Sequence, residues 1–133
     1  MINRFKIFSK IMLFAIASSL FAVNVTLNVD MSNVTVSENG VHVAGSFQGW
    51  DPAATPLADD DGDGVYSVVI DMSGVTDETV FFKYLNGNSW GSDETVSDPS
   101  CGGAGGFASD RFLDVPDVDT VLDPCLLYTS DAA

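Results

Sequence analysis

Short runs of alternating apolar and polar residues, separated by turn residues, constrain the fold of this chain more than any other feature. Val25, Leu27, Val29 and Met31 alternate with polar residues, which is the period of a strand with one buried face. Glycine, asparagine or proline separates further runs of strand character, which lie at 41–46, 65–72, 79–85, 111–115 and 120–122. No stretch after residue 22 keeps a helical period. The pattern therefore predicts an all-β fold, an antiparallel immunoglobulin-like β-sandwich of about seven short strands.

The charges of the chain are distributed very unevenly. The 133 residues hold 5 Lys+Arg and 19 Asp+Glu, and three of the five cations lie within the first ten residues. From Asp30 onward only Lys83 and Arg111 oppose all nineteen acids, so this part has a net charge of −17, against −14 for the whole chain. A domain this acidic repels phosphates, which excludes binding to nucleic acid or to an anionic membrane.

The first 22 residues have the composition of a secretory signal peptide. A basic stretch to Lys10 precedes a short apolar run from Ile11 to Phe21, and small residues lie near its end. The run is shorter than the roughly 18 residues that span a bilayer, so a retained anchor is the weaker alternative. We expect cleavage near Ala22 and a mature domain at 23–125 that is secreted, periplasmic or at the cell surface, with no membrane attachment after cleavage.

The two cysteines, Cys101 and Cys125, both fall in the exported part. Thiols in an oxidising compartment usually pair, so we expect a disulfide between them; the alternative is that each pairs beyond this chain. Residues 126–133 follow without a turn, cap or linker, and we interpret them as a doubtful tail, a sequence artefact or a truncation. We therefore expect the natural protein to continue past Cys125 as a longer multidomain chain, of which this is the N-terminal part.

Two tryptophan-bearing segments stand at the ends of predicted strands. The first, at 45–52, reads Gly-Ser-Phe-Gln-Gly-Trp-Asp-Pro, and the second, at 83–90, reads Lys-Tyr-Leu-Asn-Gly-Asn-Ser-Trp. An indole at a strand end can offer its flat apolar face to a sugar ring, while nearby polar groups bind the hydroxyls. The alternative is that Trp50, Trp90 or both belong to the core, because tryptophan is highly buried on average.

The spaced pair of segments resembles the starch-binding and glycogen-binding carbohydrate-binding modules, over about residues 25–115. Such modules bind α-1,4-glucan without catalysing a reaction. The resemblance implies that Trp50 and Trp90 stack on sugar rings and that Lys83 donates to a hydroxyl. It further implies rim contacts from Asn86 or Asn88 and from a polar residue before the last strand. That residue is Asp110 here, where the family has asparagine; a carboxylate accepts hydrogen bonds but does not donate them.

An acidic turn precedes the strand predicted at 65–72. Asp59, Asp61, Asp63 and Gly64 fit the first half of an EF-hand loop, but the twelfth position is Ile70, where a bidentate glutamate is required. An EF-hand is therefore excluded. Two interpretations stay open: a Ca²⁺ site of another kind, or a solvated hairpin turn in an acidic protein.

Residues suited to catalysis are scarce. His42 is the single histidine, and its place between Val41 and Val43 predicts a residue on a strand face. The sequence contains no nucleophile elbow, phosphate loop or Cys-x-x-Cys zinc motif. We therefore expect a non-enzymatic module that needs no cofactor and whose partner is a polysaccharide, most simply an α-glucan.

A structural or adhesive module, stabilised by calcium and part of a larger extracellular protein, is the alternative function. Such a module needs no sugar ligand. It would be favoured if Trp50 and Trp90 were buried or far apart.

Overall fold

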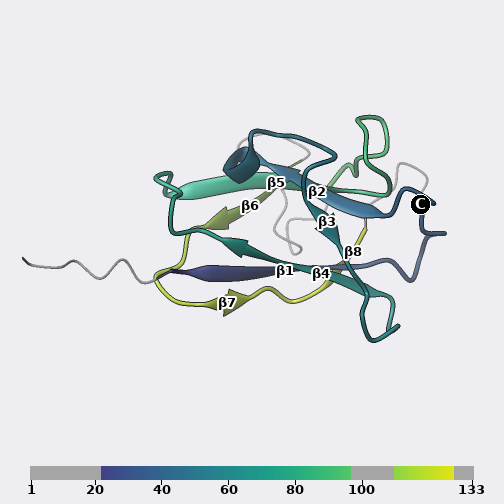
Figure 1. The fold of residues 1–133 in the computed structure, drawn as a ribbon, viewed down its shortest axis with the longest axis horizontal. Coiled ribbons are helices and arrows are strands. Elements are labelled where there is room, and N and C mark those ends of the chain that lie inside the picture. Colours follow the sequence, from purple (N-terminus) through teal and green to yellow (C-terminus); the bar gives the residue numbers. More distant parts are fainter. Residues whose placement is uncertain (1–21, 97–109, 128–133) are drawn as a thin grey trace, which may run out of the picture.

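Two β-sheets face each other in the computed structural model, which describes residues 22–96 and 110–127 (Figure 1). Within these residues eight strands follow one another: β1 (Asn24–Asp30), β2 (Val41–Gly45), β3 (Pro56–Leu57), β4 (Val65–Asp71), β5 (Thr79–Leu85), β6 (Arg111–Asp114), β7 (Thr120–Val121) and β8 (Cys125–Leu126). A 3₁₀ helix, η1 (Ser46–Gln48), is the one helical element of the same residues. None of their helices is long and apolar enough to cross a membrane.

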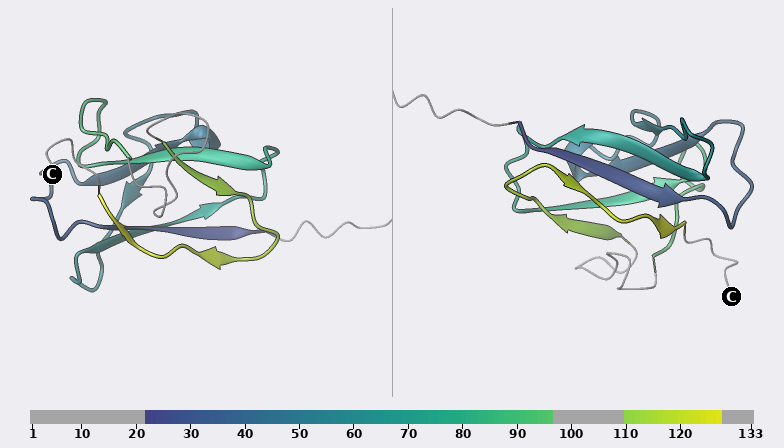
Figure 2. Two further views of the ribbon diagram at one scale, coloured as in Figure 1. Left: turned by 180° about the vertical axis from the view of Figure 1, so that it is seen from behind. Right: turned by 90° about the horizontal axis from the view of Figure 1, so that it is seen from below.

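The strands divide between a first sheet, in the order β4-β1-β7 with β8 also paired to β1, and a second sheet, in the order β3-β2-β5-β6. The predicted all-β sandwich is confirmed. The pairing is mainly antiparallel, as predicted, and the two short strands β7 and β8 pair with β1 in parallel. After β6 the chain does not turn back as a hairpin. It crosses through Pro116 to the other sheet and runs beside β1, as the yellow and purple strands of Figure 2 show.

The core lies between the sheets and follows the alternation of the sequence. Val25, Leu27 and Val29 of β1 are 0% exposed. The same period in β5 turns Val80, Phe82 and Tyr84 inward from the second sheet, so Lys83 between them points to the outer face. Lys83 therefore lies on the outer face of the second sheet, on the side away from the core.

A buried ion pair ties several elements together at one end of the core. The Arg111 Nε atom lies 2.7 Å from Glu94 Oε1, and the side chains are 4% and 0% exposed. Glu94 Oε1 also accepts the Tyr84 N–H at 3.0 Å, and Arg111 donates from Nη2 to the Leu126 carbonyl at 3.1 Å. Arg111, one of the two cations from Asp30 onward, thus belongs to the core and joins β5, β6 and β8.

The C-terminal end of the described chain extends further into the fold than the sequence indicated. Leu126 belongs to β8, and Leu127 is 2% exposed and donates its N–H to the Asp30 carbonyl at 3.1 Å. Both leucines lie in the segment that the sequence predicts to be a doubtful tail. Cys101 lies outside the described residues, so its disulfide with Cys125 stays a prediction, as does the signal peptide, which falls almost entirely outside them as well.

Candidate functional site

Two loops bring Trp50 and Trp90 together on the outer face of the second sheet. The chain leaves β2 through η1 to reach Trp50, and it leaves β5 to reach Trp90. The ring centroids lie 6.5 Å apart and the ring planes are tilted by 40°. Trp90 is 50% exposed, while Trp50 is partly buried. The two indoles, forty residues apart in the sequence, therefore form one aromatic surface.

This aromatic surface is part of an open depression of about 410 Å³, which we call the hollow. The residues that line the hollow are Trp50, Lys83, Trp90, Asp93 and Asp110. Lys83 reaches it because residues on both sides of it along β5 point into the core. Asp110 reaches it because it immediately precedes β6, whose pairing of Arg111 with Phe82 carries Asp110 opposite Lys83. Strand register thus sets the polar side chains of the hollow.

The hollow carries two carboxylates and one ammonium group. Lys83 Nζ lies 3.2 Å from Asp93 Oδ2 and 3.6 Å from Asp110 Oδ1, and its side chain is 14% exposed. Partial burial raises the pKa of Asp93, but the N–H of Gly91 and the Lys83 ammonium outweigh it, so this pKa is below its ordinary value. Asp93 is therefore ionised at neutral pH, and the three groups together have a net charge of −1.

The asparagines predicted at the rim do not line the hollow. Asn86 Oδ1 accepts the Ser37 N–H at 2.8 Å, and its Nδ2 donates to the Thr35 carbonyl at 2.9 Å. This side chain connects two loops, which is a structural role. Asn88 is exposed and is also absent from the lining. Of the six predicted residues, Trp50, Trp90, Lys83 and Asp110 come together.

Asp93 is the lining residue that sequence reasoning missed. It follows Trp90 by three residues and forms an isolated antiparallel bridge with Leu85, which returns it to the neighbourhood of Lys83. The one signal in the sequence is the shortage of cations: an acid soon after the turn that follows Lys83 is a natural partner for it.

The acidic turn lies away from the hollow, between β3 and β4. Single carboxylate oxygens of Asp59, Asp61 and Asp63 lie within 4.8 Å of one another. The Asp59 carboxylate already accepts the N–H groups of Gly62 at 2.9 Å and Gly64 at 3.0 Å, so hydrogen bonds within the turn account for its position. Oxygen ligands suit Ca²⁺, but both interpretations of this turn remain predictions.

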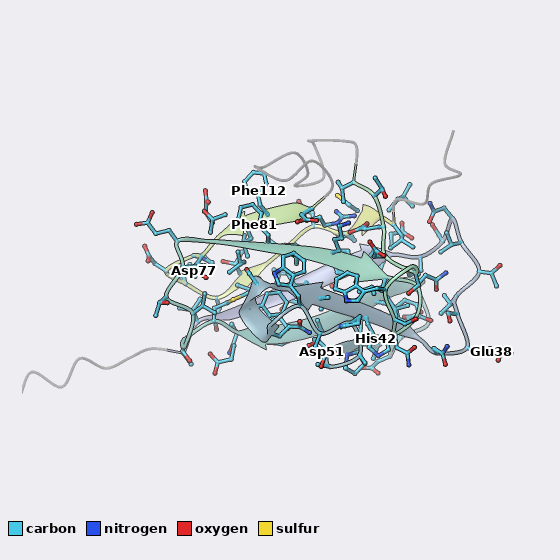
Figure 3. All side chains as sticks on the ribbon, turned by 90° about the horizontal axis from the view of Figure 1, so that it is seen from above. Glu38, His42, Asp51, Asp77, Phe81 and Phe112 are labelled. Atoms are coloured by element: carbon cyan, nitrogen blue, oxygen red, sulfur yellow. The ribbon has the colours of Figure 1, made fainter. Side chains whose placement is uncertain are left out.

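His42 occupies the strand position that its neighbours predict. It lies on β2, pairs with Leu85 and Pro56, and is 8% exposed (Figure 3). Its Nδ1 atom is buried without a hydrogen-bond partner. His42 does not line the hollow.

Searches against protein-family models, curated proteins and solved structures gave no match to this chain. The resemblance of the two tryptophan segments to starch-binding modules therefore stays an expectation. The chemistry of the hollow follows from its own groups: two apolar rings, two carboxylates that accept hydrogen bonds and one ammonium group that donates them.

Proposed function

We propose that this domain binds a neutral α-1,4-glucan, such as starch or glycogen, in the hollow and catalyses no reaction. The observation that carries the proposal is the pairing of Trp50 with Trp90 at 6.5 Å on the outer face of the sheet, with Trp90 half-exposed. A structural or adhesive module without a sugar ligand would be favoured if the two side chains were buried or far apart. Such binding needs no cofactor, and residues 1–22 predict that the domain acts outside the cell.

The tilt of the rings favours a curved glucan. Sugar rings stack through their C–H faces, and two indoles inclined by 40° meet successive faces of a chain that bends. An α-1,4-linked glucan bends from one residue to the next, whereas a β-1,4-linked glucan is extended and flat. The platform thus fits the first class of polymer better than the second.

The charge of the hollow favours a neutral ligand. Asp93 and Asp110 outnumber Lys83, so a glycan bearing carboxylate or sulfate groups meets net repulsion. A neutral sugar can donate hydroxyl hydrogens to the two carboxylates and accept from the ammonium, which has three N–H donors. We expect weak binding dominated by the two indoles, because an open site buries little ligand surface and a few aromatic anchors carry most of the energy.

Affinity electrophoresis tests the proposal. The protein should migrate more slowly in a gel containing glycogen, and the Trp90→Ala variant should lose this retardation, with at least about a tenfold loss of affinity. Phe112→Ala is the matched control, because Phe112 is 37% exposed on the same sheet and does not line the hollow (Figure 3). A gel containing an anionic polysaccharide should retard neither the wild type nor the two variants. Unretarded migration of the folded wild type in glycogen refutes glucan binding and favours the structural module.

A further inference from the structure

Trp50 has a backbone conformation that tryptophan rarely adopts. Its φ angle is +60°, and among residues 22–96 and 110–127 no other non-glycine residue has a positive φ. A bulky side chain in this left-handed region crowds the backbone, so surrounding contacts must hold it there. The preceding residue, Gly49, has a φ of +72° and adopts the same region without that strain.

The side-chain amide of Gln48 fixes the backbone on both sides of Trp50. Its Oε1 accepts the N–H of Asp51 at 2.7 Å and that of Gly45 at 3.3 Å. Its Nε2 donates to the Asp51 carbonyl at 2.7 Å and to Thr55 Oγ1 at 3.2 Å. The Trp50 N–H donates to the Gly45 carbonyl at 3.0 Å. One amide therefore connects the end of β2 to the residue that follows Trp50.

We propose that Gln48 is a positioning residue that holds Trp50 in the strained conformation and thereby sets its distance and tilt to Trp90. A turn that needed this backbone shape alone would be served best by glycine, so the strain at Trp50 points to a role for its ring. The benefit of the arrangement rests on the proposed glucan binding, whereas the strain and the positioning can be measured without a ligand.

The strain predicts an inverted order of stability at position 50. Trp50→Gly should be more stable than Trp50→Ala, by roughly threefold to tenfold in the folding equilibrium constant, because glycine tolerates the left-handed region and alanine does not. Trp90 is the matched control: its φ is not positive, so Trp90→Gly should be no more stable than Trp90→Ala. Chemical denaturation measures both pairs. A Trp50→Gly variant that is less stable than Trp50→Ala would show that the backbone at position 50 is not strained. This result would refute the proposal that Gln48 holds Trp50 in a strained conformation.

The positioning role has a spectroscopic signature. Two indoles at 6.5 Å couple their electronic transitions and give a paired band of opposite signs in circular dichroism. Gln48→Met keeps the side-chain length but removes every hydrogen bond of the amide, so the coupled band should collapse while the β-sheet signal and a cooperative thermal transition remain. Gln48→Glu keeps an acceptor for Gly45 and Asp51 and should retain part of the band; it also replaces Gln48→Met if that variant does not fold.

The two proposals fail in different ways. An unchanged coupled band in a folded Gln48→Met or Gln48→Glu protein refutes positioning by Gln48. A normal band in the wild type without retardation by glycogen refutes glucan binding and leaves the positioning role intact. Loss of both the band and glycogen retardation in a folded Gln48→Met protein is the result that we expect.

Discussion

At the scale of single residues, the two cations from Asp30 onward have separate tasks. Lys83 lies in the hollow between Asp93 and Asp110, whereas Arg111 is buried with Glu94 and contacts the Tyr84 ring face at 5.0 Å from its centroid. Burial raises the pKa of the Tyr84 hydroxyl, which keeps it neutral and able to donate to the Asn28 carbonyl. One cation thus serves the surface and the other the core.

The buried pair predicts strongly coupled substitutions. Arg111→Met should lower the free energy of unfolding by about 3–5 kcal/mol, because it removes the guanidinium that compensates the buried Glu94 carboxylate. Glu94→Gln combined with Arg111→Met should cost clearly less than the sum of the two single variants, since no lone charge remains. Urea denaturation of the three variants measures this coupling, and additive losses would contradict it.

The residues of the hollow also show what a sequence can reveal about a site. Trp50 and Trp90 were predictable because each lies five residues after the end of a strand and beside turn residues. Asp93 was not predictable as a lining residue, because its place depends on a bridge to Leu85 that forms only in the folded sheet. Asn86 matched the expected motif, yet its amide is committed to Ser37 and Thr35.

At the scale of elements, strand length decided which parts of the fold were predictable. β1, β4 and β5 have seven residues each and display a full period of alternation, so their positions and buried faces follow from the sequence. β3 and β8 have two residues each, too few for any period. The parallel pairing of β7 and β8 with β1 depends on the crossover between the sheets, and no local sequence pattern predicts that crossover.

The junction between β2 and η1 predicts a sensitive glycine. A Cβ at Gly45 would lie 2.7 Å from the Phe81 carbonyl oxygen and 2.8 Å from Phe82 Cβ, so Gly45→Ala should displace the loop that carries Trp50. We expect a loss of about 1–3 kcal/mol in the free energy of unfolding, as for other overpacked sites. Gly74→Ala is the control, because nothing lies within 4 Å of its Cβ position. Equal stability of the two variants by thermal or chemical denaturation would contradict the close packing at Gly45.

At the scale of the whole molecule, the acidic sandwich presents its two tryptophans on one face. Both tryptophans of the chain line the same hollow, on the outer face of the second sheet. The high negative charge disfavours anionic partners, which supports the proposal that the hollow binds a neutral polymer. We therefore propose that a neutral α-glucan stacks on Trp50 and Trp90.

Tryptophan fluorescence tests this claim most directly, because the chain has two tryptophans and both lie in the hollow. Titration of the protein with a linear maltooligosaccharide should change the intensity and wavelength of the emission in a saturable way, and an equal concentration of a β-1,4-linked oligosaccharide should change them much less. Emission that stays constant across the maltooligosaccharide titration, in a protein shown to be folded, would contradict the stacking of an α-glucan on Trp50 and Trp90.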